Sequence, residues 1–464
     1  MFKKIDLVFT SHPTMIYDIN GNIRKERPTI QKEIEQVNFF TKKVINYIKQ
    51  KNIKNIKISS WCGGDRDGHP LVTNNITKDV IKEINNEFDL DIRDNSKKIN
   101  FLIKKYNNEN IEVIDFINKF NFSINDELLS LINLMIDNQR FIISDCEEYF
   151  HIYFIYKASL YLNKKIKIVP LFESAECLTK SIGIIQKCLE NNIYKEDEIE
   201  IMLAYSDTSK TGGIIDSVFQ LYNVQKKLHK LSKQYNKKII FFHGRGGSFA
   251  RGGGSYLDFF NRIPDENLSE FRVTVQGERI FHEFGDDDKI ENTLNEIITS
   301  YQIRIENLHN YSDTFLNEVE KVSNICRLNY KNFITNDIID FFINDTYQSE
   351  LTNLNCGSRP SKRTSNKVTI DAIRTITWVF GWSSINFYLP CWLGYTKEFH
   401  DFNFQNKFIP WNNLYNGIID NFNNSIITSK ISKKLINKYI EISTIINSNN
   451  LNLLNDVIKR KYVG

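Results

Sequence analysis

Apolar residues recur every three or four positions over long stretches of the chain, which is the spacing of an amphipathic helix. In residues 28–52 the apolar positions are Ile30, Ile34, Val37, Phe40, Val44 and Ile48. Pro28 suits the first turn of such a helix, because its missing N–H would be unpaired there in any case. The same spacing predicts further helices over residues 76–88, 127–143, 214–236, 289–325 and 430–447.

Short runs rich in β-branched residues lie between the predicted helices. They cover residues 56–59, 166–171, 199–205, 238–243 and 271–275, and a cluster rich in Gly, Asp, Arg or Ser follows each of them. Strands that alternate with helices form a parallel sheet, and ligands bind at the carboxyl ends of its strands. The pattern therefore predicts a helix-rich α/β barrel with its active site in these clusters. With no internal repeat and no Pro/Gly/Ser-rich linker, we predict a single domain over residues 1–464.

One uncharged stretch, residues 375–396, is long enough to raise the question of membrane insertion. Polar and helix-breaking residues interrupt it: Ser383, Ser384, Asn386, Pro390 and Gly394. A spanning helix needs about 20 predominantly apolar residues, so we expect a buried helix that runs into a turn, and no membrane association. Trp378 and Trp382 share one face of this helix, which predicts core or pocket wall for them and for the nearby Trp392.

The composition is that of a globular protein of 464 residues, with 41% hydrophobic and 25% charged residues. The 60 Lys and Arg residues against 56 Asp and Glu give a net charge of only +4, which argues against a nucleic-acid partner. Seven cysteines form no CxxC pair, so reduced thiols in a cytosolic protein are expected. The N-terminus reaches His12 and Pro13 too soon to hold the apolar core of a signal peptide.

The strongest chemical signal is the glycine-rich segment 242–254, FHGRGGSFARGGG, which contains Arg245 and Arg251. Glycines let backbone N–H groups approach an anion, and guanidinium groups hold phosphate or carboxylate through two hydrogen bonds. We interpret this segment as an anion-binding loop; the alternative is a merely flexible loop. It is not a Walker A motif, because the Gly-Lys-Ser/Thr sequence is missing.

Arginine itself is informative in this chain, which has 16 Arg against 44 Lys. Where lysine suffices for solvation, arginine indicates positions that need planar geometry. The arginines in or beside the polar clusters are Arg66, Arg93, Arg245, Arg251, Arg359 and Arg374. Some of these are equally compatible with ordinary ion pairs.

Two acidic residues come directly after predicted strands. Glu173 follows one strand and Asp207 the next, with Lys210 three residues further on. Carboxylates at neighbouring strand ends can converge on Mg²⁺, which takes one or two carboxylates beside water and substrate oxygens. The alternative for each acid alone is a helix N-cap.

His12, which precedes Pro13, is a general-base candidate whose alternative is a structural role. The sequence contains neither the HExxH spacing of a zinc site nor the GxSxG motif of a serine hydrolase.

In their order along the chain, these segments resemble the phosphoenolpyruvate carboxylase family. The resemblance is carried by residues 11–14, 60–73, 90–96, 169–174, 202–213, 242–254, 272–278, 357–363 and 371–382. It implies a cytoplasmic, homotetrameric enzyme on an eight-stranded α/β (TIM-like) barrel with many additional helices. It also implies conversion of phosphoenolpyruvate and bicarbonate to oxaloacetate and phosphate, with Mg²⁺ or Mn²⁺ and without biotin.

The resemblance also implies roles for individual residues. Glu173 and Asp207 match the metal ligands of the family. Its substrate-binding arginines match Arg93, Arg245, Arg359 and Arg374, and its catalytic residues match His12, Lys210, Arg245 and Arg251.

The chain departs from the family in its short span before and between the first motifs and in Met15, where the family has Glu. These departures motivate an alternative, a non-catalytic sensor of phosphoenolpyruvate or a related carboxylate. Binding of a polyanion through the glycine-rich segment is disfavoured by the near-neutral charge.

Overall fold

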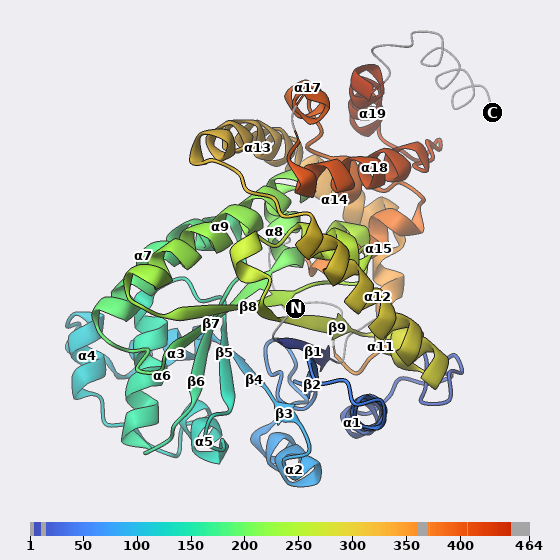
Figure 1. The fold of residues 1–464 in the computed structure, drawn as a ribbon. Coiled ribbons are helices and arrows are strands. Elements are labelled where there is room, and N and C mark those ends of the chain that lie inside the picture. Colours follow the sequence, from blue (N-terminus) through green and yellow to red (C-terminus); the bar gives the residue numbers. More distant parts are fainter. Residues whose placement is uncertain (1–3, 11–14, 360–369, 371, 406, 447–464) are drawn as a thin grey trace.

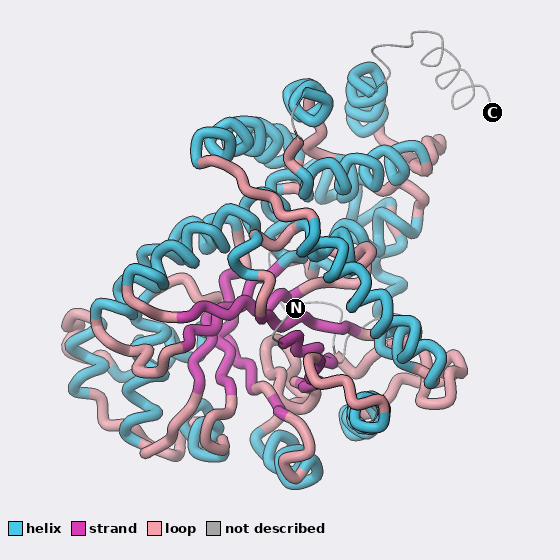
Figure 2. The backbone as a smooth tube through the Cα atoms, in the orientation of Figure 1, coloured by secondary structure: helices cyan, strands magenta, loops and turns pink. Residues whose placement is uncertain are grey.

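The computed structural model of the protein describes residues 4–10, 15–359, 370, 372–405 and 407–446. Strands form the centre of the described chain, and helices surround them (Figure 1). Figure 2 shows the same arrangement by element type, with the strands gathered inside a cover of helices and loops. The helix-rich α/β fold expected from the alternating sequence pattern is confirmed.

The strands form one parallel, nearly closed barrel. In chain order they are β1 (Lys4–Thr10), β2 (Ile56–Ser60), β3 (Asp89–Leu90), β4 (Ile92–Asn95), β5 (Arg140–Ser144), β6 (Lys167–Phe172), β7 (Glu198–Ala204), β8 (Lys238–Gly244) and β9 (Glu270–Gln276). Their spatial order is β3-β2-β1-β9-β8-β7-β6-β5-β4. Only Asp91 separates β3 from β4, so the chain itself joins the two edges of the sheet. When β3 and β4 are counted as one interrupted strand, the barrel has the expected eight strands.

Alternate residues of each strand point into the barrel, and these inward positions form three layers. The layer at the amino ends is ionic and consists of Asp6, Asp91, Arg140, Glu200 and Arg272. Two residues further along the strands lies an apolar layer, which includes Val8, Ile142, Val169, Leu171, Met202 and Phe242. The next inward positions, at the carboxyl ends, include the polar residues Thr10, Glu173 and Gln276. An apolar layer therefore separates the ionic layer from a polar carboxyl end.

Helices connect the strands and cover the outside of the barrel. Those in the first two thirds of the chain are α1 (Ile30–Gln50), α2 (Asn74–Ile84), α3 (Ser96–Tyr106), α4 (Val113–Lys119), α5 (Glu127–Leu134), α6 (Tyr149–Tyr161), α7 (Ala175–Glu190), α8 (Tyr205–Gly212), α9 (Ile214–Gln234), α10 (Tyr256–Asn261), α11 (Glu278–Phe284) and α12 (Asp287–Glu306). Short 3-10 helices cover Phe249–Arg251, Asp265–Asn267 and Tyr347–Thr352. The apolar faces of the covering helices and the outward apolar residues of the strands share one large core.

The C-terminal helices gather beside the carboxyl ends of the strands and have a second core. They are α13 (Asp313–Phe333), α14 (Asn336–Asp345), α15 (Thr375–Ser384), α16 (Leu389–Trp392), α17 (Lys397–Gln405), α18 (Ile409–Asn423) and α19 (Lys433–Ile446). Trp378, Trp382 and Trp392 are fully buried in this core, as their spacing predicted. The uncharged stretch is the expected buried helix, α15, followed by a turn.

Two helix predictions need correction. The predicted helix over 127–143 ends at Leu134, and its last part is strand β5, because the run Arg140–Ser144 is β-branched and buried inside the barrel. The predicted helix over 289–325 is two helices, α12 and α13, separated by the polar residues 307–312. Strands β1, β3, β4 and β5 were not predicted. The predicted helix over 127–143 covered β5, because a short buried run can match a helical period as well as a strand.

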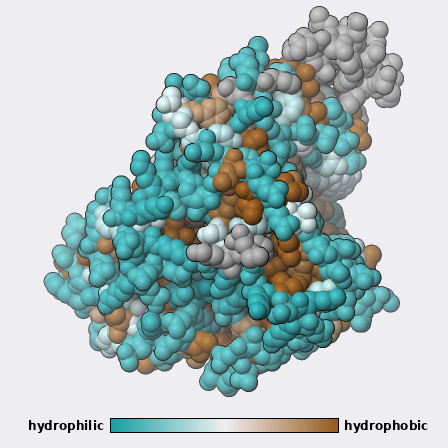
Figure 3. Space-filling view, in the orientation of Figure 1, coloured by the Kyte–Doolittle hydropathy of each residue, from teal (hydrophilic) through white to brown (hydrophobic). Residues whose placement is uncertain are grey.

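Within the described ranges, no helix combines the length and the apolar character needed to cross a bilayer. Figure 3 shows that hydrophilic residues cover most of the visible face, with hydrophobic residues exposed in smaller groups between them. All seven cysteines are buried and none is in a disulfide, which agrees with the expected free thiols.

Candidate active site

A pocket, here called the carboxyl-end pocket, opens where the strands end. Its walls come from most of the strand ends and from α8 and α15, and its lining includes Thr10, Trp61, Asp67, Arg93, Glu173, Ser206, Asp207, Gly244, Arg251, Gln276, Arg359, Arg374 and Thr375. Strand alternation accounts for several of these positions. Arg93 lies two residues after Asp91 of the ionic layer, and Glu173 two residues after the apolar Leu171. The inward side of the barrel is thus polar at the carboxyl ends of the strands, where the pocket opens.

Arg93 lies among three carboxylates on one wall of this pocket. Its Nη2 is 2.7 Å from Asp67 Oδ2 and 3.4 Å from Glu173 Oε1, and its Nη1 is 3.6 Å from Asp65 Oδ2. Nε donates to the hydroxyl of Ser144 at 2.6 Å, and the guanidinium stacks on the Trp61 ring with its carbon 5.2 Å from the centroid. Burial opposes the charged form, but the surrounding carboxylates raise the pKa of Arg93 above its ordinary value. Arg93 is a permanently charged, fixed guanidinium.

Asp65 and Asp67 belong to a loop over residues 64–69, here called the acidic loop. Arg359 reaches this loop from a distant part of the chain. Its Nη1 donates to Asp65 Oδ2 at 3.0 Å, and its Nη2 donates to the backbone oxygen of Asp67. The loop is in turn fastened to β4, because Arg93 N donates to Gly64 O at 3.0 Å and Arg66 N donates to Arg93 O at 2.9 Å. Asp65 and Asp67 therefore hold two arginines side by side at the pocket.

Arg374 approaches the pocket from the start of α15. Its Nη2 donates to Gly68 O at 2.9 Å. Gly68 has a left-handed backbone with φ of +61°, and a Cβ there would lie 2.6 Å from Arg374 Nη2. Only glycine therefore lets the arginine approach this turn.

Glu173 and Asp207 face the pocket from the ends of β6 and β7. Burial, and next the neighbouring carboxylate of Asp145, raise the pKa of Glu173 well above its ordinary value; Arg93 opposes this effect. Asp207 Oδ1 accepts a hydrogen bond from the Thr375 hydroxyl at 2.9 Å. Neither acid is a helix N-cap. Ser174 caps α7, and Asp207 lies in the first turn of α8.

The donor set of this wall fits a hard divalent cation. Two carboxylates of neighbouring strands line one cavity, and their oxygens are the ligand type that such a cation prefers. Among the described residues no group of three or more His, Cys, Asp or Glu side chains is arranged as a complete metal cage. Mg²⁺ does not need one, because water and substrate oxygens complete its shell.

Lys210 lies behind Asp207 and does not line the pocket. It is buried, its Nζ donates to Ile373 O at 3.0 Å, and the same Nζ is 3.5 Å from Asp207 Oδ1. Thr375 and Lys210 thus connect Asp207 to residues on both sides of Arg374. In this conformation the ammonium supports the acidic wall and the start of α15.

The glycine-rich segment is folded back on itself beside the pocket. A Cβ on Gly253 would lie 2.3 Å from Gly247 O, so glycine is required by close packing of the backbone. Arg251 lines the pocket, with Nε 3.2 Å from Ser206 Oγ and Nη2 2.7 Å from Gln276 Oε1. The alternative of a merely flexible segment does not describe this compact turn.

Arg245, like Lys210, is a predicted site residue that does not line the carboxyl-end pocket. Its guanidinium donates to Gly254 O and stacks on the rings of Tyr256 and Phe259, and it does not line the pocket. Burial, and next the nearby Arg279, lower the pKa of Arg245 to about 10. Residues next to each other in a strand point to opposite faces, so Gly244 faces the pocket and Arg245 the outer core. Its contact with substrate stays a prediction.

Other predicted residues complete the comparison. The structure brings Arg93, Arg251, Arg359, Arg374, Glu173 and Asp207 to one cavity. His12 lies outside the described residues. Arg66, another candidate, pairs with Glu127 at 2.6 Å and is an ordinary ion-pair partner. Sequence reasoning assigned no role to Asp65, Asp67 or Gln276, although all three stand in segments that carry the family resemblance.

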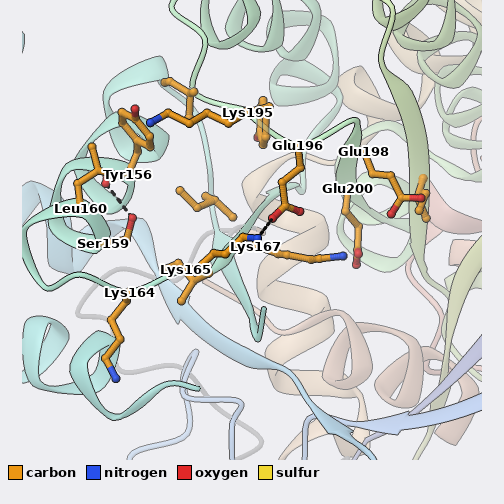
Figure 4. A pocket seen from close by; sticks show the side chains of 15 residues that line it. Tyr156, Ser159, Leu160, Lys164, Lys165, Lys167, Lys195, Glu196, Glu198 and Glu200 are labelled. Carbon is orange, nitrogen blue, oxygen red and sulfur yellow. Dashed lines mark hydrogen bonds and ion pairs between the residues drawn. The ribbon is translucent and has the colours of Figure 1, made fainter. Parts of the chain in front are cut away.

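A second pocket lies at the opposite end of the barrel (Figure 4). Its lining is drawn from the amino ends of β6, β7 and β8 and from neighbouring helices, and it includes Lys165, Lys167, Glu196, Glu198 and Glu200. Each of its carboxylates is paired with a cation. Glu196 lies 3.6 Å from Lys165, Glu198 lies 2.7 Å from Lys238, and Glu200 lies 2.7 Å from Arg140. Its carboxylates are thus each paired with a cation of the protein, and its lining in the described part of the chain has no arginine, unlike that of the carboxyl-end pocket.

The fold and the carboxyl-end pocket define an α/β-barrel protein with an arginine-rich, acidic-walled site at the carboxyl ends of its strands. The family model described as phosphoenolpyruvate carboxylase matches residues 19–110 and 138–416, and the chain belongs to that family.

Curated relatives agree with this assignment. Phosphoenolpyruvate carboxylase of Picea abies is 30% identical over 246 residues, which is 52% of this chain and 25% of the relative. The enzyme of Amaranthus hypochondriacus is 31% identical over 240 residues, 50% of this chain and 25% of the relative. Phosphoenolpyruvate carboxylase 2 of Zea mays is 31% identical over 243 residues, with the same two shares. The alignment thus spans about a quarter of the length of each relative.

Proposed function

We propose that this chain converts phosphoenolpyruvate and bicarbonate to oxaloacetate and phosphate. The observation that carries the proposal is the composition of one cavity, where Arg93, Arg359 and Arg374 face the carboxylates of Glu173 and Asp207. A phosphorylated three-carbon acid carries both a phosphate, which suits the arginines, and oxygens that suit a cation held by the acids. Family membership supports the same substrate.

The arginines would hold the phosphoryl group during its transfer. Bicarbonate oxygen attacks phosphorus, the bond from phosphorus to the enol oxygen breaks, and carboxyphosphate and the enolate of pyruvate are formed. Charge spreads over the phosphoryl oxygens in this step, and fixed guanidinium groups stabilise it without having to reorient. Arg93, which Asp65, Asp67 and Glu173 already hold in place, is suited to this role.

Mg²⁺ or Mn²⁺ would be held by Glu173 and Asp207, and when bound it would supply Lewis-acid stabilisation to substrate oxygens. Thr375 and Lys210 contact Asp207 and keep it facing the cavity. Biotin has no part in this proposal.

Carboxylation requires that water be kept from the reactive products of the first step. Gly244 and Arg251 of the glycine-rich segment line the cavity, and this segment would limit access of water. By the family resemblance, His12 would take the proton of carboxyphosphate, so that CO₂ is released beside the enolate and the new carbon–carbon bond forms. From the family resemblance we likewise propose a cytoplasmic homotetramer. Light scattering of the purified protein would test the tetrameric state.

One assay tests the proposed activity. Purified protein is supplied with phosphoenolpyruvate, Mg²⁺ and bicarbonate, and oxaloacetate is measured by coupling to malate dehydrogenase. We expect formation that stops when either bicarbonate or the divalent cation is removed. Folded protein that binds phosphoenolpyruvate but never turns it over would contradict the proposal and favour the sensor.

A further inference from the structure

The hydroxyl of Ser358 joins three segments that are far apart in the sequence. It donates to Glu33 Oε2 of α1 and lies 3.2 Å from His69 Nε2 of the acidic loop. All three side chains are buried. A hydroxyl inside the protein whose two partners come from different elements fixes the backbone that carries it, because breaking either bond leaves a buried polar group unpaired.

The direction of these hydrogen bonds follows from the one hydrogen that the Ser358 hydroxyl can donate. Burial, and next the nearby Arg359 guanidinium, lower the pKa of His69 to about 4, so its ring is neutral near pH 7. The single hydrogen of the Ser358 hydroxyl goes to Glu33. The serine oxygen therefore accepts from Nε2–H of His69, and the chain of bonds runs from His69 through Ser358 to Glu33.

Two further contacts anchor the same short segment. Arg27 Nε donates to Gly357 O at 3.2 Å, and Asn355 Nδ2 donates to Lys25 O at 2.6 Å. Residues 355–358 are thus fastened to residues 25–33 and to the acidic loop. The next residue is Arg359, whose guanidinium reaches Asp65 and Asp67 at the carboxyl-end pocket.

We propose that Ser358 is a positioning residue that, held by Glu33 and His69, fixes the backbone from which Arg359 meets the phosphate of the substrate. A guanidinium that is already ordered loses less conformational entropy when it binds an anion, so the anchor increases affinity without touching the ligand. This inference rests on the proposed function, because it assumes that the pocket binds a phosphorylated acid.

A double-mutant cycle separates positioning from a general structural role. Affinity is measured by calorimetry with phosphoglycolate, an unreactive phosphorylated acid, in the presence of Mg²⁺. We expect Ser358→Ala to weaken binding about tenfold in the parent chain, the loss of one ordered hydrogen bond. In the Arg359→Lys background the same change should weaken binding less than twofold, since the group being positioned is already altered. A similar loss in both backgrounds, or no loss in the parent, would overturn the proposal.

A matched control is Ser159→Ala. Ser159 and Ser358 are each 5% exposed, but the Ser159 hydroxyl donates to Tyr156 O within its own helix, at the opposite end of the barrel. It should leave affinity unchanged, and circular dichroism should show all variants folded. Ser358→Thr, which keeps the hydroxyl, should recover most of the affinity that Ser358→Ala loses; no recovery would contradict the positioning role. If the parent chain binds no phosphoglycolate and forms no oxaloacetate, the proposed function fails, and the inference with it.

Discussion

Asp207 shows how much of the site depends on single side chains. Its carboxylate is partly exposed to the cavity, accepts from Thr375 and lies near the Lys210 ammonium. Those two neighbours orient the acid toward the position that a divalent cation would take. Arg93, by contrast, is held by Asp65, Asp67 and Glu173, so a cation and a phosphate would meet groups that are already in place.

Asp207→Asn tests the acidic wall at this scale. Asparagine keeps the shape and can still accept from Thr375, so the fold should be retained, while the charge that attracts a cation is lost. We expect oxaloacetate formation to fall by about 100-fold or more, comparable to the loss of one electrostatic stabilising group. Mn²⁺ binding, followed by electron paramagnetic resonance, should weaken in parallel. The control is Asp420→Asn, on the exposed side of α18. Unchanged Mn²⁺ affinity in Asp207→Asn would remove Asp207 from the metal site.

At the scale of elements, α6 shows how a buried histidine can begin a helix. Nδ1 of His151 accepts from the backbone N–H groups of Glu147 and Glu148 at 3.3 and 3.4 Å. Nε2 lies 3.0 Å from Asn100 Oδ1 and donates to it. Protonation of Nδ1 would remove an acceptor from two backbone donors. Burial, the largest influence, lowers the pKa of His151 to about 4.

This geometry predicts a pH dependence of stability. The histidine pKa is about 6.5 in the unfolded chain and about 4 in the folded one, so between these values the unfolded chain binds the extra proton. The contribution of His151 is therefore present above pH 6.5 and is lost as the pH falls toward 4, by about 1.4 kcal/mol per pH unit. Urea unfolding of the parent and of His151→Gln should show the difference between their unfolding free energies shrinking over this range. A constant difference would contradict the lowered pKa of His151 in the folded chain.

For the whole molecule, the ionic layer explains how a barrel this polar inside stays closed. Arg272 of β9 pairs with Asp6 of β1, with Glu200 of β7 and with Asp91 at 2.7–2.8 Å. Asp91 is the residue between β3 and β4, where the sheet edges meet. One guanidinium therefore connects the closing point of the barrel to its opposite side. Burial raises the pKa of Asp91 to about 6, while Arg272 opposes that rise.

Removal of this guanidinium should destabilise the entire barrel. Arg272→Leu leaves three buried carboxylates without their shared cation, and breaking a buried pair in this way costs about 3–5 kcal/mol. Chemical denaturation should report a loss of this size. Lys238→Met removes two ion pairs, to Glu198 and Glu270, at the exposed amino ends of β7 and β9. It should lower the free energy of unfolding by less than about 1 kcal/mol. Equal effects of the two changes would show that the layer does not stabilise the barrel.

Local pattern was enough for much of this protein. Apolar spacing predicted α1, α2, α9 and α19, and β-branched runs predicted β2, β6, β7, β8 and β9, because period and propensity are properties of neighbouring residues. The polar clusters after these strands identified Glu173, Asp207 and Arg251, which share one cavity since parallel strands all end on the same side of a barrel. The choice of arginine over lysine added Arg93, Arg359 and Arg374, which line the same cavity.

What the tertiary structure alone decided is which face each residue takes and which distant residue it meets. Arg245 and Arg251 look alike in sequence, yet one residue of strand alternation sends Arg245 into the outer core. The partnership of Ser358 with Glu33, or of Arg359 with Asp65, joins positions about 300 residues apart, and no local signal encodes such a pairing. Side-chain chemistry is written in the sequence, but distance and direction arise only when the barrel closes.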